Sequence, residues 1–131
     1  MTRPFALNGL TLDTGALVAI ELGDPRMRAL LSQAVEQGIA VHVPSGVVAQ
    51  AWRGGACQAR VARLLNSTTV QVPALDALNA RAVGYLSGTS GHDDVVDVQV
   101  MFDARLHGHR VVTSDPADLG GIDPSIVLIA I

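Results

Sequence analysis

Residues 110–115 read Arg-Val-Val-Thr-Ser-Asp, an apolar run that ends in two hydroxyl side chains and a carboxylate. Residues 9–13, Gly-Leu-Thr-Leu-Asp, follow the same plan, with Asp13 directly after the run. Short apolar runs between longer segments of helical period are typical of parallel sheets. Because ligands of open α/β sheets bind outside the carboxyl ends of the strands, we expect Asp13 and Asp115 at one such edge.

The whole chain alternates runs of this kind with helical segments. We therefore predict an α/β fold, a single domain over residues 1–131. Its parallel strands are expected at residues 9–12, 40–43, 69–72, 110–113 and 126–129.

The helical segments have marked ends. Asp24 and Pro25 predict the start of a helix that Gly38 ends. A helical stretch from about residue 45 should break at Gly54 and Gly55 and resume through residues 61–65.

The second half contains two further predicted helices. One begins after Asp76 and ends before a polar, glycine-containing loop at residues 87–91. The other runs from about Asp93 to His107, with Gly108 as its stop signal.

Composition excludes several classes of function. The chain has 131 residues, a formal charge of −3 and one cysteine, so neither an internal disulfide nor a thiolate metal cluster is expected. All 9 basic residues are arginines, which excludes chemistry that needs a catalytic lysine. The first ten residues do not resemble a secretory leader, and no apolar run is long enough to span a membrane. We expect a cytoplasmic protein.

The late helix adds two more acids to the predicted edge of the sheet. Asp94 and Asp97 are three residues apart and share one helix face. Carboxylates brought this close repel one another unless a cation neutralises them, and oxygen ligands favour Mg²⁺ or Mn²⁺. Such an ion can activate water and stabilise a phosphoryl oxygen, which favours hydrolysis of a phosphodiester bond.

Each acid also has an ordinary structural interpretation. Asp13 and Asp94 are suited to cap helices, and Asp115 before a proline is suited to a turn. Asp97 is harder to explain structurally, because it interrupts an apolar segment and a buried unpaired acid is costly.

Taken together, Leu12-Asp13-Thr14, Asp94-Val95-Val96-Asp97 and Val111-Val112-Thr113-Ser114-Asp115 resemble the PIN domain. The chain most resembles the VapC toxins of VapBC toxin–antitoxin pairs, over essentially its whole length. The segment at residues 44–55, Pro-Ser-Gly-Val-Val-Ala-Gln-Ala-Trp-Arg-Gly-Gly, is similar to a mycobacterial or actinobacterial branch.

This resemblance implies a three-layer α/β/α fold with four to five parallel strands, Mg²⁺- or Mn²⁺-dependent endoribonuclease activity, a homodimer and a VapB-type antitoxin partner. It implies that Asp13, Asp97 and Asp115 hold the metal. Asp94 would be an auxiliary acid, and Thr113 or Ser114 the accompanying hydroxyl.

One position departs from the family pattern. Gln50 stands where the family usually has a glutamate, so it keeps a carbonyl ligand but loses a charge. Metal affinity should fall as a result. Glu21 is a candidate substitute, with a solvent-facing helix residue as its ordinary interpretation.

Other polar residues carry weaker signals. Arg53, Arg60 and Arg63 are expected along one side of the broken helical segment, where they suit RNA phosphates or an acidic antitoxin segment, or simply face solvent. His107 and His109 flank Gly108, and we interpret them as turn residues rather than metal ligands.

Two other enzyme classes gather aspartates at strand ends. A receiver-type phosphoacceptor needs a lysine, which is absent, and a haloacid-dehalogenase-type phosphatase needs an acid at the position of Gly15. The remaining alternative, motivated by Gln50, is a PIN scaffold that binds RNA or a protein partner without cutting.

Overall fold

The computed structural model describes residues 8–131. The prediction that no leader is present falls, for residues 1–7, outside the described part. The described chain forms a five-stranded sheet in which all neighbours are parallel, in the order β3-β2-β1-β4-β5. The strands are β1 (Gly9–Leu12), β2 (Ala40–His42), β3 (Val70–Gln71), β4 (Arg110–Thr113) and β5 (Leu128–Ala130).

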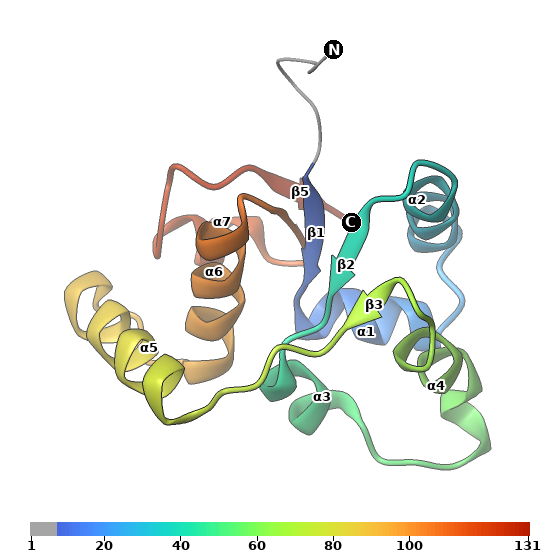
Figure 1. Ribbon diagram of the computed structural model, residues 1–131, viewed down its shortest axis with the longest axis horizontal. Helices are drawn as coiled ribbons and strands as arrows, with labels where there is room; N and C mark the ends of the chain where they lie inside the picture. The colour runs from blue at the N-terminus through green and yellow to red at the C-terminus, as the bar shows by residue number, and fades with distance from the viewer. Residues whose placement is uncertain (1–7) are drawn as a thin grey trace.

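Helices cover both faces of this sheet (Figure 1). On one side lie α1 (Thr14–Glu21), α2 (Pro25–Glu36) and α4 (Ala59–Leu65), and on the other α5 (Ala77–Ser90) and α6 (Val95–His107). The short helices α3 (Ser45–Ala51) and α7 (Pro116–Gly120) follow β2 and β4, and a 3₁₀ turn, η1 (Ala56–Gln58), precedes α4. The predicted three-layer α/β/α arrangement is therefore present.

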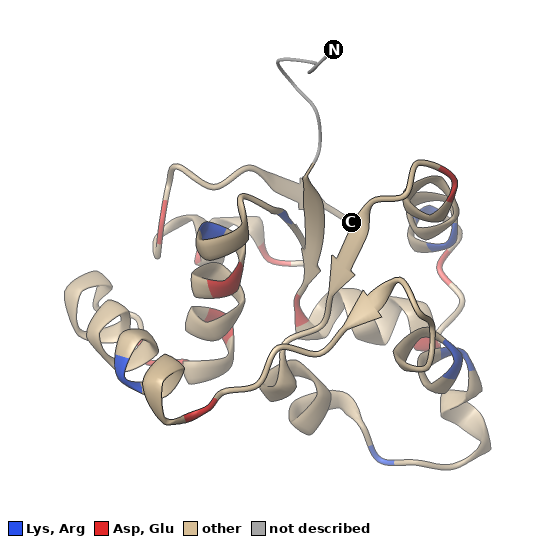
Figure 2. Cartoon of the chain, viewed as in Figure 1, with Lys and Arg blue, Asp and Glu red and all other residues tan. Residues whose placement is uncertain are grey.

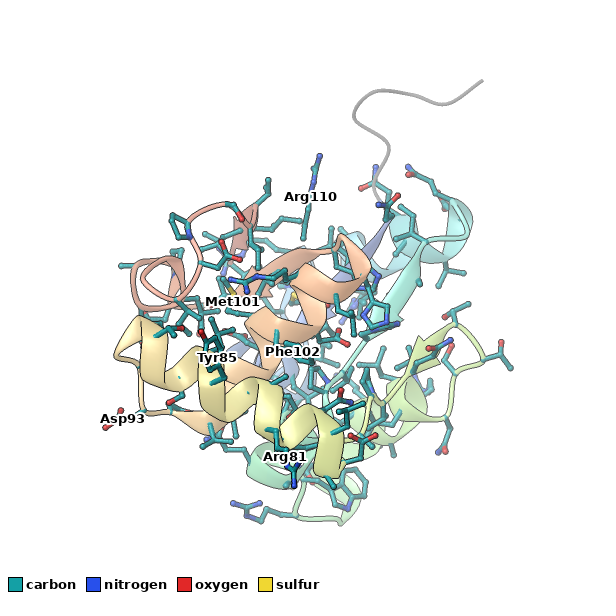
Figure 3. The ribbon with its side chains drawn as sticks, turned by 60° about the vertical axis from the view of Figure 1, so that its left-hand side comes forward. Arg81, Tyr85, Asp93, Met101, Phe102 and Arg110 are labelled. Atoms are coloured by element: carbon teal, nitrogen blue, oxygen red, sulfur yellow. The ribbon has the colours of Figure 1, made fainter. Side chains whose placement is uncertain are left out.

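The sheet and helices enclose a continuous apolar core. Leu10 and Leu12 of β1, Val111 of β4 and Met101 of α6 are completely buried. Burial of each such side chain contributes about 1.5–3 kcal/mol. On the outer side, Phe102 of α6 lies toward α5, whose Tyr85 is largely exposed (Figure 3). The longest described helix has 14 residues, and none combines the length and apolar character needed to cross a bilayer.

Strand boundaries differ from the prediction only at their ends. The last strand begins at Leu128 instead of residue 126, because the Ile126 N–H donates to Asp123 O in a turn. Its pairing continues further along the chain, where the Ile131 N–H donates to Thr113 O at 3.0 Å. The second and third predicted strands are likewise shorter than expected.

The predicted loop at residues 87–91 is wrong, because α5 continues to Ser90. Leu86 is buried, and the hydroxyls of Thr89 and Ser90 donate to carbonyl oxygens of the preceding turn, which supports helix. The helix ends where Gly91 adopts φ +73°, a left-handed conformation that favours glycine.

Candidate functional site

Asp13 lies where β1 ends and α1 begins. Its carboxylate accepts a hydrogen bond from the Ala16 N–H at 2.8 Å, so it caps α1 as the ordinary interpretation predicts. Its own N–H donates to Val112 O at 3.2 Å, which fixes this end of β1 against β4. The residue is 5% exposed. Asp13 is therefore a buried carboxylate at the carboxyl edge of the sheet.

The end of β4 supplies the partners of Asp13. The Thr113 hydroxyl and the Ser114 N–H both donate to its carboxylate. The Thr113 hydroxyl also accepts from the Asp115 N–H at 2.8 Å. Asp115 caps α7 by accepting from the Asp118 N–H at 3.3 Å. Thr113 thus links the acids of the two neighbouring strands.

The start of α6 forms the other half of the site. The Asp94 carboxylate caps α6 by accepting from the N–H groups of Val96 and Asp97, at 3.0 and 3.2 Å. The Asp97 carboxylate lies 3.2 Å from His92 Nε2, and Asp118 lies 3.6 Å from the same nitrogen. Ligand atoms of His92, Asp97 and Asp118 all lie within 4.8 Å of one another, a spacing that one metal ion can bridge.

Sequence reasoning missed Asp118. The sequence feature that could have identified Asp118 is its spacing of three residues from Asp115. This spacing places Asp118 in the first turn of α7, at the same edge of the sheet. His92, in the loop before α6, joins Asp97 to Asp118.

Burial makes two of these carboxylates unfavourable as anions. Burial raises the pKa of Asp13 above its ordinary value, and the charge of Asp115 adds to the rise, against the hydrogen bonds from Thr113 and from backbone N–H groups. Burial likewise raises the pKa of Asp97, with further contributions from Asp94 and Asp118, against the hydrogen bond to His92. A bound cation would relieve both costs.

The donor set fits a hard divalent ion. The contacts define two halves, one around Asp13 and Asp115 and one around Asp97 and Asp118, which meet at α7. Carboxylate oxygens supply nearly all of the ligand atoms, as Mg²⁺ and Mn²⁺ prefer. Acidic residues occur along α6 and near the end of β1, and basic residues occur on α2, α4, α5 and the end of α6 (Figure 2).

The two candidate auxiliary residues lie in different places. The hydroxyl of Thr14, the residue after Asp13, donates to the side-chain oxygen of Gln50. Gln50 therefore lies at the edge of the site. Glu21 is the last residue of α1, about 12 Å along the helix from Asp13. The structure does not bring Glu21 to the other acids.

A glycine permits the close packing at this edge. A Cβ on Gly15 would lie 1.9 Å from Ser114 Oγ and 2.9 Å from Ser114 Cβ. No side chain fits there unless Ser114, the residue after β4, shifts. Gly15 is thus a site residue that sequence reasoning missed, since only the meeting of α1 with β4 reveals it.

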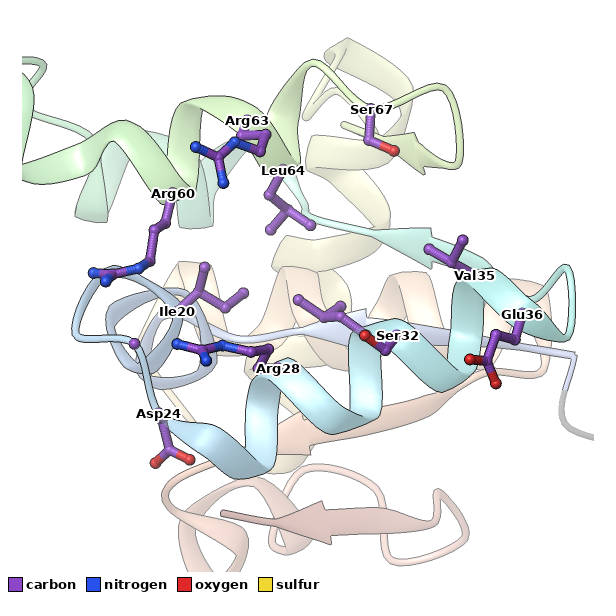
Figure 4. Close-up of a pocket in the computed structure, with 12 residues that line it drawn as sticks. Ile20, Asp24, Arg28, Ser32, Val35, Glu36, Arg60, Arg63, Leu64 and Ser67 are labelled. Atoms are coloured by element: carbon purple, nitrogen blue, oxygen red, sulfur yellow. The ribbon is translucent and has the colours of Figure 1, made fainter.

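The predicted arginines do not form one row. The Arg53 guanidinium donates to the carbonyls of Ala49 and Trp52, at the end of α3. Arg60 donates to Glu21 O at 3.2 Å and, with Arg63, borders a groove of about 620 Å³ between α2 and α4 (Figure 4). Ile20, Leu31, Val35 and Leu64 supply its apolar lining, and Arg28 a third guanidinium.

Two solved structures are similar to this chain. One is the structure of FitAB bound to an IR36 DNA fragment, with 14% identity over 92% of this chain and 94% of that chain, and a TM-score of 0.61. The other is the crystal structure of FitAcB from Neisseria gonorrhoeae, with 17% identity over 92% of this chain and 96% of that chain, and a TM-score of 0.61. No protein-family model matches the sequence, and no curated protein matches it. At these identities the likeness concerns the fold, and it confirms the PIN-like α/β/α architecture. The actinobacterial branch stays a prediction.

Proposed function

We propose that the chain is a metal-dependent endoribonuclease that hydrolyses RNA phosphodiester bonds, the toxin of a VapBC-type toxin–antitoxin pair. The observation that carries the proposal is the gathering of carboxylates from three segments at one edge of the sheet. Asp13, after β1, is buried, Asp97 of α6 is half-buried, and Asp115 and Asp118, at the β4–α7 junction, are exposed. The PIN-like fold is consistent with it.

Asp13, Asp97 and Asp115 would hold Mg²⁺ or Mn²⁺, with Asp118 and Asp94 close by. When bound, the ion activates water and stabilises charge on a phosphoryl oxygen. The chain's own residues set the geometry of the ligands. Thr113 and Ser114 orient the Asp13 carboxylate through their hydrogen bonds to it. His92 holds the Asp97 carboxylate on the side that faces Asp118.

Gln50 favours one alternative, a PIN scaffold that binds RNA or a partner without cutting. The Gln50 side chain contributes no charge, and its oxygen already accepts a hydrogen bond from Thr14. Asp118, however, adds a carboxylate beside Asp97, which offsets the charge that Gln50 lacks. We therefore favour the enzyme.

Cleavage of total RNA by the purified protein tests the proposal. We expect discrete products with Mg²⁺ or Mn²⁺ and none with EDTA. Asp97→Asn should abolish cleavage, whereas Asp93→Asn, which removes an exposed charge from the same segment, should retain it. RNA binding without cleavage under either metal would support the scaffold instead.

The groove between α2 and α4 suits the antitoxin. Its apolar lining and the guanidinium groups of Arg28, Arg60 and Arg63 match an amphipathic segment with acidic residues. We assign this partner role to Arg60. Arg53, whose guanidinium donates to carbonyls at the end of α3, stays a candidate for RNA phosphates.

A synthetic helix with leucines on one face and glutamates on the other provides a probe for the groove. Fluorescence anisotropy should detect binding that Arg60→Ala weakens and that Arg81→Ala, on α5, leaves unchanged. Equal affinities in the two variants would contradict the assignment. The homodimer and the cytoplasmic location stay predictions, and light scattering of the purified protein tests the first of them.

A further inference from the structure

A second polar cluster lies between α6 and the sheet. This histidine cluster consists of Thr11 of β1, His42 of β2, Asp103 and His107 of α6, and His109, which precedes β4. Asp103 follows Asp97 by six residues, about 9 Å along the axis of α6. The cluster is therefore separate from the acids of the proposed active site.

The Asp103 carboxylate is the centre of the cluster. Its Oδ2 accepts from the Thr11 hydroxyl at 3.0 Å and lies 3.0 Å from His42 Nδ1. The Thr11 oxygen also lies 3.0 Å from His109 Nδ1. Because the single Thr11 hydroxyl proton goes to Asp103, His109 Nδ1 donates to Thr11 in this arrangement. Three imidazole rings pack edge-on or tilted around the carboxylate.

The cluster buries a carboxylate without a permanent counter-charge. Asp103 and His42 are each 4% exposed, and His109 is 8% exposed. Within the described part of the chain, Asp103 has no arginine in ion-pair range, and its partners there are His42 and His107. A buried carboxylate is costly unless a cation pairs with it.

We propose that His42, Asp103 and His109 bind a divalent transition metal of the zinc class. One ligand atom from each residue lies within 4.8 Å of the others. The Nδ1–Oδ2 spacing of 3.0 Å between His42 and Asp103 is close to the separation of two ligands on tetrahedral Zn²⁺. The ion would place a permanent cation beside the buried Asp103 carboxylate. A water or the Thr11 hydroxyl would complete the coordination.

The donor set distinguishes this site from the proposed active site. Two imidazoles with one carboxylate favour Zn²⁺, Co²⁺ or Ni²⁺ over Mg²⁺. The surroundings already orient the carboxylate, through the Thr11 hydroxyl and through His107, whose Nδ1 lies 3.2 Å from Asp103 Oδ1. His107, with its side chain 40% exposed, is the side on which solvent reaches the cluster.

A metal here would act on the fold. Its ligands come from β2, α6 and the turn before β4, segments far apart in the sequence. Bound Zn²⁺ would tie α6, which carries Asp97, to the sheet. This inference does not depend on the proposed nuclease, and its tests use metal binding and stability alone.

Zn²⁺ titration of the EDTA-treated and dialysed protein, in excess Mg²⁺, tests the proposal. We expect about one equivalent to bind and to raise the melting temperature. Asp103→Asn and His109→Gln should each weaken binding more than tenfold. Asp93→Asn, which removes an exposed carboxylate outside the cluster, should leave Zn²⁺ affinity unchanged.

Crystals of the wild-type protein grown with Co²⁺ decide the question even if the cluster variants fail to fold. We expect an anomalous-difference peak within bonding distance of His42, Asp103 and His109. No binding, a peak beside His92 and Asp97 only, or unchanged Zn²⁺ affinity in Asp103→Asn would overturn the proposal.

Discussion

Replacement of Gln58 by methionine should destabilise the turn that separates α3 from α4. Gln58 is 5% exposed, and its side chain makes three short hydrogen bonds to backbone groups. The oxygen accepts from the N–H groups of Arg53 and Gly54 at 2.7 and 2.9 Å. The nitrogen donates to Ala51 O at 2.8 Å. These bonds hold the chain where Gly54 and Gly55 adopt positive φ.

The size of the effect follows from these three bonds. Each contributes about 1 kcal/mol net, and methionine keeps the side-chain volume, so the cavity contribution is small. We therefore expect Gln58→Met to lower the free energy of unfolding by about 3 kcal/mol, a large share of the typical 5–15 kcal/mol. Gln33→Met, at an exposed position of α2, should change it by less than about 0.5 kcal/mol.

Urea unfolding of the wild type and both variants measures the change, and amide hydrogen exchange locates it. The amides of Arg53 and Gly54 should exchange faster in Gln58→Met than in the wild type. A loss below about 1 kcal/mol together with unchanged protection of these two amides would refute the reasoning.

Three further predictions concern the acids and the histidine cluster. In EDTA, Asp97→Asn should raise the free energy of unfolding at pH 7, because burial disfavours the ionised carboxylate. In a separate measurement with Mg²⁺ at 100 times the wild-type Kd, the variant should lack the stabilisation of about 2.7 kcal/mol that the wild type gains. Gly15→Ala should lower Mg²⁺ affinity in calorimetric titration by displacing Ser114, and adding Ser114→Gly should restore it. Burial lowers the pKa of His109 to about 4 in the folded protein. With metal chelated, the His109 imidazole therefore takes up a proton in the unfolded chain as the pH falls below 6.5, but stays neutral in the folded chain until about pH 4. The free energy of unfolding should then fall by about 3 kcal/mol between pH 6.5 and 4. His109→Gln should reduce this dependence on pH in urea titrations, and an equal dependence in the variant would contradict the claim that His109 causes it.

Local signals predicted most of the fold. The runs that became β1 and β4 were placed at their observed bounds, because a buried parallel strand reads as a continuous apolar run. The caps of α2 and α5 at Asp24 and Asp76, and the stop of α6 at Gly108, depend on bonds within a few residues and were also predicted.

Features that depend on tertiary packing were not predicted. The polar segment at residues 87–91 reads as a loop, but its hydroxyls bond to the helix backbone and Leu86 packs inward. His109 reads as a turn residue, yet folding places it on Thr11 and near His42. Asp118 reaches Asp97 only because α7 follows β4 at the edge where α6 begins.

The central claim is that Asp13, Asp97 and Asp115 form one metal site. The position of bound Mn²⁺ tests this claim most directly. In crystals grown with Mn²⁺, we predict an anomalous-difference peak in contact with the carboxylates of Asp97 and Asp13, which disappears in Asp97→Asn and persists in Asp93→Asn. A Mn²⁺ peak elsewhere, or one that Asp97→Asn leaves in place, would contradict the account.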